Sequence, residues 1–435
     1  MTEQHFLDRT TGEERISALA TGYRENIAGI RDITQTREVN NHVHTRYSFS
    51  PYSPTEAVWY ARLAGLAAVG SVDHESIGAA RETAAAGRTI GMATTSGVEV
   101  RVSMTGTPFA NRRLNNPDTE GNAYIVIHGV QEVAIREMEA FLKPLVTARR
   151  RRNEQQVARL NTLLERSKIP TLDYHREVEA ISWVSQGGTV TERHILFALA
   201  QKITSTLAPG EDVVSVVEER LGVEIPELIG QRIRDEHNPH RLYDLLGVFK
   251  AALVDAFFIP PDDQECPPYE MVTAFARSIG AIPAYSYLGD VGESPTGDKK
   301  AQHFEDAYID ELFAWIGRMG FQAVTYMPPR NTPAQLQRVQ RLCDEYQLLQ
   351  ISGVDINSSR QSFNCPEVLQ PEFAHLNQTT WALIAHEKLS SRDKRYGLFH
   401  EDNPMKQHSL QERIAAYSAV GEAHDPKNPD AMRLP

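Results

Sequence analysis

The chain has 435 residues, of which 41% are hydrophobic and 23% are charged, a composition typical of a soluble globular protein. Its formal net charge is −12, whereas a general nucleic-acid binder carries an excess of basic residues, so we expect no nucleic-acid polymer as a partner. The three cysteines are isolated and form no CxxC pair, which argues against a zinc ribbon or a disulfide framework and favours a reducing compartment.

Alternating strands and helices are predicted along most of the chain, after an N-terminal stretch that is too polar for a signal peptide. Ser53 and Glu56 predict the start of a helix because this spacing forms a capping box, and Thr332 with Gln335 predicts another. The predicted strands cover residues 38–44, 66–74, 91–100, 122–130, 281–288, 321–328 and 348–357. The predicted helices between them cover residues 53–65, 76–87, 269–280, 303–320 and 332–347.

Strands that alternate with helices of this length predict a parallel sheet. Seven strands without a glycine-rich dinucleotide loop favour a closed barrel over a doubly wound sheet. We therefore predict a protein of the α/β class, with a TIM-like (β/α) barrel built from residues 1–140 and 266–400.

Residues 141–265 interrupt this alternation and are predicted to form a helical insertion that caps the mouth of the barrel. The most apolar long stretch within them, residues 242–261, carries three charged side chains and so predicts a buried helix, not a membrane span. We interpret the basic run Arg149–Arg152 as a solvated helix face rather than a phosphate-binding patch. Residues 401–435 predict a peripheral tail, and we expect a cytoplasmic protein without a membrane partner.

Histidines and acids stand at the ends of five predicted strands. Two residues two apart in a strand point to the same face, so His42 and His44 aim both imidazoles at one spot, which suits a divalent metal. A lone pair of this kind is more often two surface or core histidines. In a parallel barrel, however, the active site forms where the strands end, which favours a metal centre. The strand-end candidates are His42, His44, Asp73, His74, Glu99, His128 and Asp355.

Over residues 38–360 the chain resembles the PHP family, the polymerase and histidinol phosphatase metallohydrolases. The motifs that carry the resemblance are HVHTRYS (42–48), VDHE (72–75), GVEV (97–100), IHGV (127–130) and GVDIN (353–357). The resemblance implies a distorted barrel of seven strands and hydrolysis of phosphoesters with a cluster of two or three metal ions. Family members with a helical insertion after the fourth strand often act on small phosphorylated metabolites or nucleotides.

The ligand set that the resemblance implies is incomplete. Phe49 stands where the family has an acid, and Ser286 with Tyr285 and Asn357 stand where it has histidines. Carried over to this chain, the first metal position keeps His42, His44, Glu99 and Asp355, the second keeps Glu99 and His128, and the third keeps His74. We therefore expect one or two divalent ions per chain, with Mn, Zn or Fe all suited to mixed imidazole and carboxylate ligands.

Further candidates lie beside these strands. Thr189 and Glu192 predict a capping box, which places His194 in the first turns of a helix in the insertion, as a catalytic group, a ligand or a half-buried structural histidine. The predicted catalytic residues are Asp355 and His194, and the predicted substrate-binding residues are Arg330, Arg360 and Asn357, with Lys299 and Lys300 as weaker candidates. Arginine is favoured because its fork matches phosphate oxygens.

These patterns predict a metal-dependent hydrolase that cleaves a phosphoester of a small phosphorylated metabolite or nucleotide. Two alternatives remain open. The thinned ligand set would also suit a mononuclear metal hydrolase or lyase that acts on a carboxylated or sugar-like substrate. The protein would otherwise be a non-catalytic scaffold that keeps a metal for stability.

Overall fold

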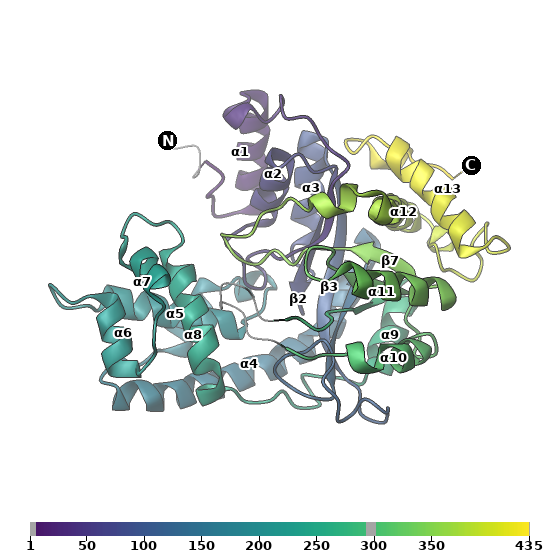
Figure 1. Cartoon of the computed structure of the whole chain (residues 1–435). Coiled ribbons are helices and arrows are strands. Elements are labelled where there is room, and N and C mark those ends of the chain that lie inside the picture. Colours follow the sequence, from purple (N-terminus) through teal and green to yellow (C-terminus); the bar gives the residue numbers. More distant parts are fainter. Residues whose placement is uncertain (1–5, 293–301, 435) are drawn as a thin grey trace.

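The computed structural model describes residues 6–292 and 302–434 and contains one seven-stranded sheet, nearly closed into a barrel (Figure 1). The strands are β1 (Val39–Val43), β2 (Ala68–His74), β3 (Ala93–Ser103), β4 (Asn122–His128), β5 (Ile282–Ser286), β6 (Ala323–Tyr326) and β7 (Leu349–Ser352), paired in this order. Ile356, beyond the end of β7, pairs with Val43 of β1 and brings the two edges of the sheet together. The predicted α/β barrel is thus confirmed.

The sheet is mixed rather than parallel, because β4 runs antiparallel to both β3 and β5. The remaining neighbours pair in parallel. Residues 104–121, which join β3 to β4, contain no helix. A parallel neighbour needs a long crossover connection, usually a helix, so this non-helical segment returns the chain in the opposite direction. The expectation of a wholly parallel sheet was wrong at this strand.

Helices cover the outside of the barrel. They are α1 (Gly12–Arg24), α2 (Pro54–Leu63), α3 (Ala80–Ile90), α9 (Tyr269–Ser278), α10 (Ile309–Ile316), α11 (Pro333–Glu345), α12 (Ala374–Ser390) and α13 (Leu410–Ala423). One apolar cluster joins α1, α2 and α3 to β1 and β2, and a second joins α9, α10 and α11 to β3–β6. The capping boxes predicted at Ser53 and Thr332 start α2 and α11.

The helix α12 closes the end of the barrel where the parallel strands begin. Val39, Ala68 and Ala93, the first residues of β1, β2 and β3, share an apolar cluster with Leu383 of α12 and Tyr417 of α13. The opposite end, where these strands finish, is the end at which the polar side chains of an active site gather in a parallel barrel.

A group of helices with its own apolar core is inserted between β4 and β5. It comprises α4 (Ile135–Arg166), α5 (Glu192–Ser205), α6 (Val213–Leu221), α7 (Glu227–Arg234) and α8 (Arg241–Phe257). Figure 1 shows α4 running from the barrel along one side of the other four helices. The apolar stretch 242–261 forms most of α8 and is buried along one side, and no described helix is long and apolar enough to cross a membrane.

Candidate metal centre

The ends of β1 and β7 bring together three residues that could bind a metal. The backbone of His44 donates to the carbonyl of Ile356 at 2.9 Å, which places Asp355 against the end of β1. His44 Nε2 consequently lies 3.2 Å from Asp355 Oδ1. Ligand atoms of His42, His44 and Asp355 all lie within 4.8 Å of one another.

A second group shares His44 and adds His74, which ends β2, and Glu99, which lies within β3 because this strand continues to Ser103, beyond its predicted end. His74 pairs in register with Glu99, and its Nδ1 lies 2.9 Å from Glu99 Oε2. Glu99 also approaches His42 Nε2 at 3.8 Å and His44 Nε2 at 3.9 Å. Three imidazoles and two carboxylates therefore form one continuous cluster. In the sequence-based assignment Glu99 accompanied His42, whereas in the structure its nearest imidazole is that of His74.

The chemistry of this cluster fits a divalent ion. Buried polar atoms normally have hydrogen-bond partners, yet His42 Nε2, His44 Nε2 and His74 Nδ1 lie near carboxylate oxygens without an aligned hydrogen bond to any described residue. Burial lowers the pKa of His42 and holds that of His74 well below its usual range, which favours the neutral imidazole that a metal requires. Glu99 and Asp355 add two carboxylates, whose negative charge a cation would balance.

The pKa values of the remaining members reflect their closeness. Burial raises the pKa of Glu99. Burial also opposes ionisation of Asp355, but the adjacent His44 outweighs it and holds the pKa of this carboxyl far below its usual range. For His44, burial is outweighed by Asp355 and Glu99, so the pKa of the imidazole is raised. His44 and Asp355 thus interact strongly, although His44 Nε2 makes no aligned hydrogen bond among the described residues.

His128 lies near this cluster, close enough to His42 for the two imidazoles to affect each other. It ends β4, but because β4 is antiparallel it pairs with Gly97, two residues before Glu99 on β3, and with Ile282 at the start of β5. Its Nε2 is buried without a partner, and burial, followed by the nearby His42, lowers its pKa to about 3. Within the described residues it joins neither group of potential ligand atoms, so its role as a ligand stays a prediction.

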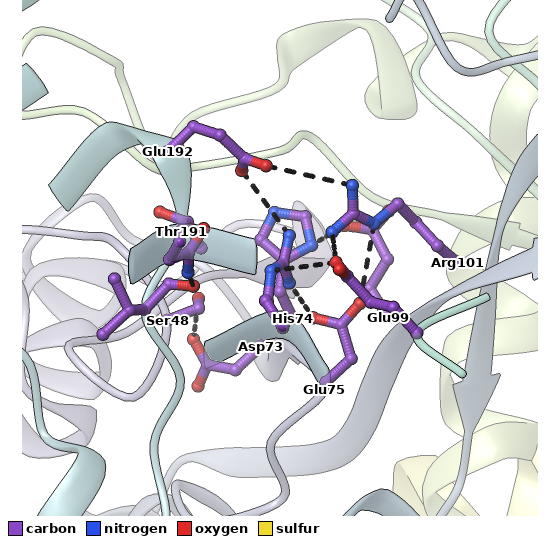
Figure 2. Close-up of polar contacts among 12 residues, drawn as sticks. Ser48, Asp73, His74, Glu75, Glu99, Arg101, Thr191 and Glu192 are labelled. Carbon is purple, nitrogen blue, oxygen red and sulfur yellow. Dashed lines mark hydrogen bonds and ion pairs between the residues drawn. The ribbon is translucent and has the colours of Figure 1, made fainter. Parts of the chain in front are cut away.

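Asp73 accepts hydrogen bonds from residues next to the cluster, among them Ser48 (Figure 2). Its carboxylate accepts hydrogen bonds from the Thr45 backbone at 2.7 Å and from the Thr45 and Ser48 hydroxyls at 2.6 Å each. The Ser48 hydroxyl contacts His44 Nδ1 at 3.2 Å. A partner on Nδ1 fixes the ring and directs Nε2 toward the cluster, as carboxylate-linked partners do for metal-binding histidines.

Two residues of interest belong to the packing of the inserted helices. Phe49 lies in their apolar core, with its ring centroid 5.0 Å from that of His194 and 5.7 Å from that of Phe197. His194 Nδ1 accepts the backbone N–H of Thr191 at 3.0 Å, so the capping box of α5 joins Thr191 and His194 rather than Thr189 and Glu192. Burial lowers the pKa of His194 to about 3. These contacts are those of a helix-capping residue.

The predicted substrate-binding residues have different surroundings. Asn357 Nδ2 donates to Asp355 Oδ1 at 2.6 Å, so it lies beside the cluster. Arg330 Nε donates to the Leu288 carbonyl at 3.1 Å, and burial lowers its pKa. Both nitrogens of the Arg360 fork donate to the carboxylate of Asp244 in α8, at 2.5 and 2.6 Å. Lys299 and Lys300 lie outside the described residues.

A buried ionic network, which was not predicted from the sequence, adjoins the candidate metal ligands. It joins Glu75, Arg101, Arg149, Arg152, Glu192 and Glu265. Arg149 and Arg152 are 1% and 5% exposed, so the interpretation of this run as a solvated face was wrong at both positions. Glu75 follows His74, and Arg101 is two residues beyond Glu99, so the network surrounds these two candidate ligands (Figure 2).

No family model and no curated protein matches this chain. The solved structures similar to this chain include the following two. One is a protein from Bifidobacterium adolescentis named as a metal-dependent phosphoesterase, with 18% identity over 76% of this chain and 94% of that one and a TM-score of 0.49. The other is an amidohydrolase from Chromobacterium violaceum with bound sulfate and no metal, with 16% identity over 78% of this chain and 96% of that one and a TM-score of 0.50. At this identity the second likeness shows a shared fold.

Proposed function

We propose that the protein is a metal-dependent hydrolase that cleaves a phosphoester of a small phosphorylated metabolite or nucleotide. The observation that carries the proposal is the cluster of three imidazoles and two carboxylates, at the carboxyl ends of β1, β2 and β7 and at Glu99 within β3, whose imidazole nitrogens lack aligned hydrogen bonds among the described residues. The residues that would hold one or two ions of Mn, Zn or Fe are His42, His44, His74, Glu99 and Asp355, with His128 nearby.

When bound, a divalent ion supplies a Lewis acid that polarises the phosphoryl group and acidifies a coordinated water. The chain's own residues do the rest. Asp73 and Ser48 orient His44, and Asn357 holds the Asp355 carboxylate by a hydrogen bond. The Asp355 side chain is 38% exposed, so substrate and water reach the cluster from its side. Arg330 brings a positive charge to the same end of the barrel, where it would favour an anionic substrate.

The surroundings of the other predicted residues give them supporting roles in this proposal. His194 shapes the start of α5, and Arg360 ties the segment after β7 to α8 through Asp244. Because the Arg360 fork is already engaged by a carboxylate, we assign phosphate binding to Arg330 in preference to Arg360.

A second candidate function is hydrolysis of an amide or another carboxylated substrate at a single ion. It is motivated by the fold shared with an amidohydrolase and by Phe49, which packs among the inserted helices instead of offering a ligand. The number of ions per chain and the bond that is cleaved distinguish the two candidates.

The test is turnover by protein reconstituted with Mn, Zn or Fe, against phosphomonoesters, phosphodiesters and N-acyl amino acids. We expect release of inorganic phosphate or of a phosphomonoester, abolished by His42→Ala and unaffected by His408→Ala, a change at an exposed histidine. Elemental analysis of the same samples would count one or two ions per chain. Amide cleavage without phosphoester cleavage would favour the second candidate, and no turnover with metal bound would favour a scaffold.

A further inference from the structure

Arg193, the second residue of α5, reaches from the inserted helices to the metal ligands. Its Nη1 donates to Asn357 Oδ1, and Asn357 Nδ2 donates in turn to Asp355 Oδ1 at 2.6 Å. A carboxamide can accept a hydrogen bond and donate one at the same time, which suits Asn357 to join a guanidinium to a carboxylate. Asn357 is 8% exposed, so this connection is largely shielded from water.

The charge of Arg193 has no carboxylate partner at ion-pair distance among residues 6–292 and 302–434. Its neighbours differ in this respect, because Arg149, Arg152 and Arg360 each pair directly with a glutamate or aspartate. An arginine so close to metal ligands, yet without a counter-ion of its own, leaves guanidinium N–H groups free to bind an anion.

A second cation faces Arg193 from α8. Lys250 lies on a helix that packs against α5, and the charge of Arg193, followed by burial, lowers the pKa of the Lys250 ammonium to about 8. Lys250 comes 57 residues after Arg193, so the two charges converge only because α5 and α8 pack together.

We propose that Arg193 binds the phosphoryl group of the substrate beside the metal ligands, with Lys250 as a second cation. The inference rests on the proposed phosphoesterase function and assigns the anion site to the inserted helices, in addition to Arg330 of the barrel. A guanidinium stays ionised, and its planar fork matches phosphoryl oxygens, so charge and shape both favour arginine at this position. Asn357 holds the fork in place and contributes no charge.

The test measures binding of inorganic phosphate to the metal-loaded protein by isothermal titration calorimetry. Arg193→Gln keeps an amide that can donate to Asn357 but removes the charge, Arg193→Lys keeps the charge without the fork, and Arg166→Met changes an exposed arginine of α4 as the matched control. We expect phosphate affinity to fall about 10- to 100-fold in Arg193→Gln and less in Arg193→Lys, since a hydrogen bond to a charged group contributes this much. Metal content should stay at the parent value in every variant, and the control should bind phosphate normally.

Different outcomes overturn different statements. Parent protein that binds phosphate as tightly as Arg193→Gln would overturn the role of Arg193 and leave the phosphoesterase proposal intact. Metal lost from Arg193→Gln would show that Arg193 positions Asp355 instead of binding the anion. Metal-loaded parent that neither binds phosphate nor cleaves a phosphoester would overturn the proposed function itself. Should Arg193→Gln fail to fold, Arg193→Lys and Lys250→Gln decide, with unchanged phosphate affinity in both counting against the site.

Discussion

His44 belongs to both groups of potential ligand atoms, whereas His42 belongs to one and His74 to the other. We therefore expect graded effects on metal content. His44→Ala should remove almost all bound metal, because changes even to partners of a ligand cost about 10- to 100-fold in metal affinity. His74→Ala should keep the group formed by His42, His44 and Asp355 and retain part of the metal. Elemental analysis after dialysis measures this, and equal metal content in the two variants would contradict the shared position of His44.

Glu305 gives a prediction about pH. Its side chain is fully buried, Oε1 accepts the backbone N–H of Leu288 at 2.9 Å, and burial raises its pKa to about 7. The unfolded carboxyl ionises near its usual value of 4.5, so between these values the folded state binds the extra proton. Stability is therefore lost as pH rises through this window.

We expect Glu305→Gln to remove this loss. The variant should gain up to about 3 kcal/mol over the parent at pH 8 and nothing below about pH 4.5, as the free energy of unfolding in urea would show. Glu345→Gln, at an exposed position of α11, is the control. A difference from the parent that is the same at every pH would mean that the pKa of Glu305 is the same in the folded and unfolded states.

The individual candidate ligands were the part of the site that could best be predicted from the sequence. His42, His44, His74, Glu99 and Asp355 were predicted because each ends a strand, and the structure brings all five together. Arg193 was missed because its role depends on Asn357, 164 residues later, and nothing local marks that contact. The signal in the sequence was its place immediately before His194, which was itself a predicted site residue.

At the scale of elements, hydrophobic pattern gave the strands and helices but not the direction of β4. Alternation of apolar residues is the same for a strand read either way. The useful signal was the segment 104–121, which has no helix and so cannot make a parallel crossover. The predicted start of α5 was two residues too early. Thr189 stands three residues before Glu192 and Thr191 three residues before His194, and of these two pairs Thr191 with His194 caps the helix.

Phe49 supplies the prediction for the inserted helices. Family resemblance suggests that Phe49→Asp would restore a metal ligand, but the ring is 7% exposed and packs against His194, Phe197 and Tyr243. We expect Phe49→Asp to add no metal and to destabilise the protein by more than the roughly 3–5 kcal/mol of a buried Phe→Ala change, because it also buries a charge. Phe49→Leu should cost much less. An additional ion per chain in a folded Phe49→Asp protein would contradict this.

At the scale of the whole molecule, three kinds of contact join the inserted helices to the barrel besides the hydrogen bond from Arg193 to Asn357. Phe49 extends from the barrel into their apolar core, Arg360 pairs with Asp244, and the buried network connects α4 and α5 to the ends of β2 and β3. These contacts differ in strength. The Arg360 side chain is 37% exposed, so solvent screens its ion pair, whereas Arg149 and Glu75 are almost wholly buried.

The network yields the last prediction. Arg149→Met leaves the buried carboxylate of Glu75 with the more distant Arg101, at 3.9 Å, as its one remaining counter-ion among residues 6–292 and 302–434. Removing one partner of a buried pair costs about 3–5 kcal/mol, so we expect a loss of this size, against less than about 1 kcal/mol for Arg360→Met. Adding Glu75→Gln to Arg149→Met should recover part of it, because the uncompensated charge is then gone. Urea unfolding of the parent, the two single variants and the double variant measures these values.

Metal titration of the same four proteins measures the metal affinity of the candidate ligands beside the network. Because Glu75 is adjacent to His74, metal affinity should fall together with stability in Arg149→Met and remain normal in Arg360→Met. Equal stabilities for the two single variants would mean that the network contributes no more than a surface ion pair, and that the apolar core around Phe49 holds the inserted helices to the barrel.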